Sequence, residues 1–156
     1  MMRALIIYQT TFGSNKRIAQ SLEAILDDMG HDVVVKDVRK GDINDVVRAD
    51  ITIFSSPTHI GNAPRRMRRF LKRVASSEAE GSYVLISTAM ADTDPEGDNS
   101  LKSMADALSG SSMSRVGSMV LKAEDGLEEG FEDGLEGLVS MALEEIGAHR
   151  AEERSD

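Results

Sequence analysis

The sequence predicts an α/β domain built on a doubly wound five-stranded parallel sheet, with helices on both faces. Short apolar runs alternate five times with segments whose apolar residues recur at helical spacing. Continuous apolar runs are typical of parallel strands that are buried on both faces. Strict alternation of strands and helices, with right-handed crossovers, then implies a parallel sheet in a single layer. The length of 156 residues suits one such domain.

Each expected element follows from its own pattern. The strands are centred on the apolar runs 5–8, 33–35, 51–54, 83–86 and 116–121. The main helices cover 18–29, 67–74, 101–108 and 131–146, and a short connection with one or two helical turns covers 41–47. Gly30 ends the first helix with the usual C-terminal signal. We therefore expect one domain over residues 1–147, followed by a polar, frayed C-terminal tail over 148–156.

Composition excludes several classes of function. The chain has no cysteine and three well-separated histidines, so it offers no disulfide, no thiol catalyst and no zinc site with several His or Cys ligands. No apolar run approaches the ~20 residues of a membrane span. The apolar stretch at the N-terminus is too short for a secretory signal. We expect a soluble, cytoplasmic protein.

The net charge of −9 is unevenly distributed along the chain. Residues 124–156 hold twelve acidic and two basic side chains, whereas the rest of the chain is nearly neutral. An acidic chain does not favour nucleic acid as a partner. We interpret the acidic segment as a solvated face.

The loops that follow the strands are the candidate site, because ligands of open parallel sheets bind outside the carboxyl ends of the strands. The first such loop offers hydroxyls on Thr10, Thr11 and Ser14, and Gly13 permits a tight turn. With the N–H groups of the following helix, these residues form an anion site. The loop matches neither the Walker A motif nor the three-glycine dinucleotide fingerprint.

This first loop resembles the flavodoxin phosphate loop, Thr/Ser-x-Thr-Gly-x-Thr. Thr10 matches the first position and Gly13 matches the glycine, whereas Phe12 replaces the middle threonine and Asn15 replaces the last. For this loop alone, an ordinary capped turn between a strand and a helix is the alternative interpretation.

The loop after the third strand, 56–64, strengthens the resemblance. It is similar to the Pro-Thr-x-x-Gly-Asn segment, and the helix after it to the Met-x-x-Phe-Leu helix, of flavodoxin-fold quinone reductases. The resemblance implies the strand order 2-1-3-4-5 and a loop that borders the isoalloxazine ring of FMN. Pro57 and Gly61 are expected to shape a rigid turn, and backbone groups from Thr58 to Asn62 to meet the pyrimidine edge of the ring.

Individual side chains at the ring keep more than one role. His59 or Ile60 covers a ring face, although His59 is equally well interpreted as an exposed loop residue. For Asn62 we favour the N-cap of the helix that contains Pro64. The resemblance places the loop after the fourth strand on the other ring face, where flavodoxins often stack an aromatic residue. Met90 either packs there through its sulfur or faces the core.

The predicted FMN contacts come from three loops, and no catalytic or metal-binding residue is predicted. They are Thr10, Thr11, Phe12, Gly13, Ser14 and Asn15; Pro57, Thr58, His59, Ile60, Gly61 and Asn62; and Thr88, Ala89 and Met90.

A basic stretch, Arg65 to Arg73, follows the second loop and holds six positive charges in nine residues. A solvated helix face is the simpler interpretation. The alternative is that Arg65 and Arg66 lie near the flavin. There they attract an anionic partner, the phosphate of NADPH or an anionic quinol, and raise the flavin's reduction potential.

Three functions are consistent with these patterns. We favour an FMN-dependent electron carrier between redox partners, because the chain is a single domain without an evident acid–base catalyst. An NAD(P)H-dependent quinone or FMN reductase is the second, with a small quinone as substrate. The third is a binding domain without FMN, which the altered phosphate loop and the missing aromatic residue leave open.

Overall fold

A computed structural model describes residues 1–155 and confirms the predicted fold: five parallel strands in the order β2-β1-β3-β4-β5. The strands are β1 (Arg3–Tyr8), β2 (Asp32–Asp37), β3 (Ile51–Pro57), β4 (Ser82–Ala89) and β5 (Ser114–Lys122). The helices are α1 (Ser14–Asp28), α2 (Ile43–Arg48), α3 (Arg65–Ala75), α4 (Asn99–Ala107) and α5 (Phe131–Ser155), with short 3₁₀ turns η1 (Val38–Lys40) and η2 (Pro95–Gly97).

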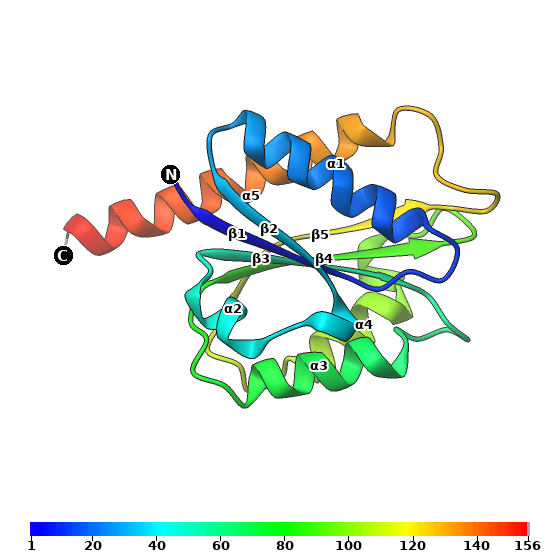
Figure 1. The fold of residues 1–156 in the computed structure, drawn as a ribbon, viewed down its shortest axis with the longest axis horizontal. Coiled ribbons are helices and arrows are strands. Elements are labelled where there is room, and N and C mark those ends of the chain that lie inside the picture. Colours follow the sequence, from blue (N-terminus) through cyan, green and yellow to red (C-terminus); the bar gives the residue numbers. More distant parts are fainter. Residues whose placement is uncertain (156) are drawn as a thin grey trace.

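The sheet separates two apolar cores (Figure 1). α1 and α5 cover one face, where Ile6, Leu22 and Leu135 are fully buried. α2, α3 and α4 cover the other, where Phe54 and Leu71 are fully buried. Residues along β1 alternate between the two cores, because successive strand side chains point to opposite faces. With both faces covered, the sheet leaves ligands only its edge.

The loops after β1, β3 and β4 lie together at the carboxyl edge of the sheet, on the right of Figure 1. β1 and β3 are neighbours, with Tyr8 paired to Ser55, and β3 and β4 are neighbours, with Pro57 paired to Thr88. Parallel register therefore brings the ends of the three strands to one place.

The C-terminal helix is longer than the sequence predicts. Instead of fraying after Gly147, residues 148–155 continue α5 to Ser155, while Asp156 lies outside the described residues. The stretch from Ala148 to Arg154 contains good helix formers and no breaker, so nothing in it ends the helix. These residues are exposed, and the last buried position of α5 is Ile146. Arg150 pairs with Asp50 at 3.0 Å.

Deletion of residues 148–156 should change the free energy of unfolding by no more than about 1 kcal/mol, because an exposed ion pair such as Arg150–Asp50 contributes little. As the matched comparison, Ile146→Ala should cost about 2–4 kcal/mol, because it opens a cavity under α5. Urea unfolding followed by circular dichroism measures both. A truncation as costly as Ile146→Ala would mean that the helical extension belongs to the folding unit.

Candidate functional site

The first loop turns sharply at Gly13, whose φ of +96° favours glycine. Its N–H donates to the hydroxyl oxygen of Thr10 at 2.8 Å, which closes the turn. Gly13 is the N-cap of α1, and neither a capping side chain nor an acidic residue accompanies the first turn of that helix. A helix start of this kind leaves N–H donors and partial positive charge for an anion.

The hydroxyls predicted for phosphate lie around this helix start. Ser14 is the first residue of α1, and Thr11 is exposed in the preceding loop. A Cβ at Gly13 would meet nothing within 4 Å, so the space over the turn is open. Open space, free backbone donors and nearby hydroxyls fit a phosphate group.

Asn15 has a role that the sequence does not reveal. Its side chain is 1% exposed and holds the three loops together. Its amide oxygen accepts a hydrogen bond from Ser55 Oγ on β3 at 2.7 Å, and its Nδ2 donates to Thr88 Oγ1 on β4 at 3.1 Å. The Asn15 and Thr88 side chains therefore hold the loops together rather than project into the space between them.

The second loop forms a tight turn from His59 to Asn62, as the sequence predicts from Gly61. His59 N donates to Asn62 O at 2.6 Å, and Asn62 N donates to His59 O at 3.2 Å. Ile60 has φ +52° and Gly61 φ +75°. Two consecutive positive φ values are the pattern of a type I′ turn. A β-branched residue such as Ile60 rarely adopts that conformation.

The predicted N-cap role of Asn62 is wrong. The helix begins at Arg65 with Pro64 as its N-cap, and no side chain caps it locally. Asn62 is instead bound into the turn through its backbone. Gln9, which sequence reasoning missed, supplies the cap from the end of β1: its Oε1 accepts a hydrogen bond from Met67 N at 3.1 Å. A polar residue directly after a strand is the only sequence signal for this cap.

Three apolar side chains stand out at the tips of the three loops. Phe12 is 97% exposed, Ile60 91% and Met90 71%. The alternative that Met90 faces the core is therefore wrong. Large apolar side chains left in water at one edge of a sheet mark a ligand or partner site.

The remaining predicted contacts lie within the same loops. Pro57 ends β3 and is partly buried, Thr58 and His59 are exposed, and Ala89 ends β4. All three predicted loops thus meet at one edge, with Thr88 and Asn15 turned inward.

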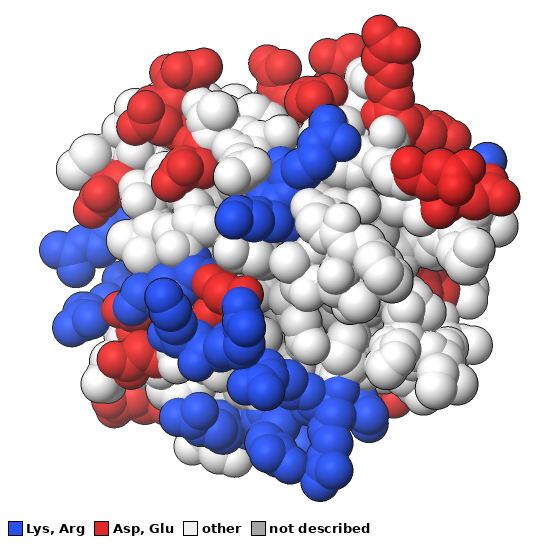
Figure 2. All heavy atoms as spheres, turned by 45° about the vertical axis from the view of Figure 1, so that its right-hand side comes forward, with Lys and Arg blue, Asp and Glu red and all other residues white. Residues whose placement is uncertain are grey.

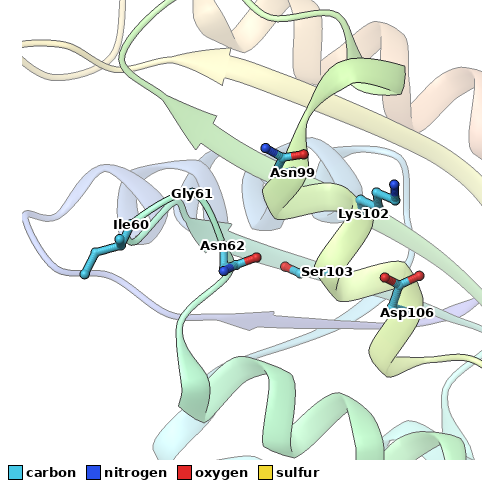
Figure 3. Close-up of a pocket in the computed structure, with 7 residues that line it drawn as sticks. All are labelled: Ile60, Gly61, Asn62, Asn99, Lys102, Ser103 and Asp106. Carbon is cyan, nitrogen blue, oxygen red and sulfur yellow. The ribbon is translucent and has the colours of Figure 1, made fainter.

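A polar cavity of about 340 Å³ lies on the outer side of the second loop, against α4 (Figure 3). Its lining residues are Ile60, Gly61, Asn62, Asn99, Lys102, Ser103 and Asp106. In the close-up, Asn62 and Ser103 point toward one another, whereas Ile60 points away from the other side chains. Ser103 Oγ accepts a hydrogen bond from Ala63 N at 3.0 Å, so α4 supports this loop.

A second hollow, about 590 Å³, lies between η1 and α3 and is called the basic groove below. Five of its eleven lining residues are arginines and none is acidic: Gln9, Val38, Arg39, Gly41, His59, Pro64, Arg65, Arg66, Arg69, Phe70 and Arg73. Gln9 and His59 also belong to the loops of the site. The groove therefore opens directly beside the predicted flavin position.

Asp37, the last residue of β2, binds Arg39 of this groove. Arg39 Nε and Nη2 donate to the two carboxylate oxygens at 3.1 and 3.0 Å. Burial raises the pKa of Asp37, but the hydrogen bonds and charge of Arg39, with a smaller contribution from Arg66, outweigh it and hold the pKa below its usual value. Asp37 is thus paired mainly with Arg39, and its attraction to Arg66 is weaker.

Comparison with known proteins identifies the family. Residues 5–121 match the family model described as Flavodoxin domain. The chain belongs to the flavodoxin domain family. No curated protein sequence matches it significantly. This family membership confirms the resemblance seen in the first two loops, and flavin-dependent electron transfer is the function that the family supports.

Solved flavodoxin structures share the fold over nearly the whole domain. A short-chain flavodoxin associated with a PDU bacterial microcompartment has a TM-score of 0.76 at 19% identity, covering 94% of this chain and 99% of that one. The Streptococcus pneumonia flavodoxin has a TM-score of 0.75 at 23% identity, with the same coverage. Rubredoxin oxygen:oxidoreductase from Desulfovibrio gigas has a TM-score of 0.78 at 15% identity, and the match covers 94% of this chain but 36% of that one.

Replacement of Asn15 by alanine should lower the free energy of unfolding by about 1–3 kcal/mol, because the buried hydroxyls of Ser55 and Thr88 lose a partner. It should also weaken flavin binding, since the loops lose their common support. Urea unfolding and flavin titration measure the two effects. Ser14→Ala is the control and should leave stability unchanged, because no hydrogen bond of its side chain is present in the described structure.

Replacement of Ile60 by asparagine should stabilise the flavin-free protein by about 1 kcal/mol, because asparagine tolerates the left-handed conformation and the exposed side chain gives up little packing. Ile60→Val retains the β-branch and should not stabilise. Flavin affinity should fall in the asparagine variant if Ile60 contacts the ring. Thermal unfolding of the apoprotein decides the first point, and an unchanged midpoint for Ile60→Asn would contradict the strained turn.

Proposed function

We propose that this chain binds FMN at the carboxyl edge of its sheet and carries electrons between redox partners. Flavin binding is the property that family membership implies. The observation that supports FMN in particular is the helix start at Gly13, which offers a phosphate group free N–H donors without a competing carboxylate. A flavin nucleotide needs such a socket beside a flat apolar slot.

Different residues would bind the phosphate and the ring of FMN. The N–H groups of the first turn of α1, with the hydroxyls of Thr11 and Ser14, would hold the phosphate. Ile60 and Met90 would flank the ring and keep water from its faces. The turn that contains Gly61 brings backbone groups close to the polar edge of the ring, since glycine has no side chain to block the approach.

Bound FMN supplies one-electron and two-electron redox chemistry, so the chain needs no catalytic acid, base or nucleophile of its own. Its contribution is to position the flavin, limit its contact with water and present it to a partner. Among the described residues, no helix is both long and apolar enough to cross a membrane. The cytoplasmic location stays a prediction from the sequence.

An absorbance spectrum of the purified protein, taken before and after FMN addition and desalting, tests cofactor binding. Flavin bands retained near one FMN per chain support the proposal, whereas a colourless protein would favour a binding domain without FMN.

Gly13→Asp should weaken FMN binding at least ~10-fold, because it places a carboxylate at the phosphate position. Gly13→Asn is the matched control: it has the same shape, tolerates positive φ, and should retain most of the affinity.

Turnover separates the carrier from a reductase. The loaded protein should exchange electrons rapidly with a reduced or oxidised redox protein. It should not sustain oxidation of NADH or NADPH when a quinone is supplied. Steady NAD(P)H oxidation that depends on the quinone would overturn the carrier assignment in favour of the reductase.

A further inference from the structure

Most of the positive charge of the basic groove has no ion-pair partner among residues 1–155, and Arg39, which pairs with Asp37, is the exception. Arg65, Arg66 and Arg69 are exposed, and none of them forms an ion pair or a side-chain hydrogen bond within residues 1–155. Arg73 likewise forms no ion pair within those residues, and its guanidinium lies 5.9 Å from the centre of the Phe70 ring. These four side chains lie on one helix, in a protein whose net charge is −9.

The arrangement of this charge works against the helix that bears it. Arg65 and Arg69 are four residues apart, as are Arg69 and Arg73, and like charges at that spacing repel. The first turn of α3 contains no acidic residue to offset the repulsion. Such a concentration of uncompensated charge is expected where an external anion completes it.

Figure 2 shows the distribution of charge on the face that includes the site. Basic side chains gather along its lower part, where α3 lies, and acidic side chains predominate along its upper part. A smaller basic group also lies near the upper centre, and a few acidic side chains lie among the basic ones at the lower left. The exposed acidic residues that precede α5 include Glu124, Asp125, Glu128 and Glu129. An acidic molecule approaching this face is therefore drawn toward α3 and repelled from the opposite flank.

We propose that the basic groove and the exposed face of α3 are the docking surface for the acidic face of a redox partner protein. This inference rests on the proposed electron-carrier function. The partner is a protein because the arginines are exposed and spread along α3 over about 12 Å, from Arg65 to Arg73. Such a surface suits a row of carboxylates better than one enclosed phosphate group.

The basic groove adjoins the loops of the proposed flavin site. Gln9 and His59 line it and also belong to the loops of the flavin site. Gly41 holds the far wall against α3, because a Cβ there would lie 2.7 Å from the ring of Phe70. A partner seated on α3 is thus brought to the apolar loop tips beside the flavin, where Ile60 is exposed.

Electron transfer to two probe proteins of opposite charge tests the proposal. The FMN-loaded protein is reduced and mixed by stopped flow with plastocyanin, an acidic copper protein, or with cytochrome c, a basic haem protein. The rate with plastocyanin should fall about tenfold as salt rises from about 20 to about 300 mM, because screening removes the attraction. A rate that rises with salt would show that the net charge of the chain governs docking, and would overturn the proposal.

The triple variant Arg65→Gln, Arg66→Gln, Arg69→Gln should lower the rate with plastocyanin about tenfold at low salt and leave the rate with cytochrome c undiminished. The matched control is Arg3→Gln, Arg115→Gln, Arg154→Gln. It removes the same charge from exposed positions at the amino ends of β1 and β5 and at the end of α5. Equal losses in the two triple variants would contradict a local docking surface.

A measurement without flavin separates this inference from the proposed function. A fluorescent deca-glutamate peptide should bind the apoprotein at low salt. The triple variant of Arg65, Arg66 and Arg69 should not bind the peptide, whereas the matched control variant should. FMN binding without preference for plastocyanin or the peptide would overturn the docking surface and leave the cofactor assignment intact. Peptide binding without FMN binding would overturn the cofactor assignment and leave the acidic-ligand surface intact. Saturable binding of tripolyphosphate, with no binding of the peptide, would overturn the proposal in favour of a small phosphate-bearing ligand.

Discussion

The buried amide of Asn15 is the contact on which the candidate site depends. It joins the start of α1 to the ends of β3 and β4 through Ser55 and Thr88. Parallel register brings these strand ends near each other but does not fix the loops that leave them. A satisfied polar network in a region of low dielectric does so, because every alternative arrangement leaves a buried polar group without a partner. The loops proposed for the phosphate and for the ring of FMN are thereby linked to each other.

The same constraint explains why apolar residues are exposed at the loop tips. Both faces of the sheet are covered by helices, so the interior has no room for a large planar ligand. The binding surface must then come from loops, and loops held by polar contacts at their bases can present Phe12, Ile60 and Met90 to water at their tips. Further hydrogen bonds support the loops: Gln9 caps α3, Ser103 Oγ accepts from Ala63 N, and Asp98 accepts from Ser87 and from the N–H of Ser100.

Local pattern was sufficient to predict the strands, the main helices and the three loops of the site, because each depends on periodicity or on glycine at a turn. The predictions that failed depend on tertiary neighbours. Asn62 has the residue type of an N-cap, but the turn engages its backbone and Gln9 supplies the cap instead. Asn15 aligns with a phosphate-binding threonine, yet its side chain turns inward to two hydroxyls that lie 40 and 73 residues away in the sequence. No local pattern encodes such contacts.

The net charge of the chain and the local charge on α3 likewise lead to different expectations. The net charge of −9 predicts that the chain repels acidic molecules. This repulsion applies at distances where the whole chain acts as one charge. At contact distance, screening in salt limits each group to its own neighbourhood, about 8 Å under physiological conditions. There the arginines of α3 form no ion pair within residues 1–155, since Asp37 is bound by Arg39 and attracts Arg66 only weakly. The fold thus converts an acidic sequence into a polarised face, with its positive side adjoining the loops where electrons would enter and leave.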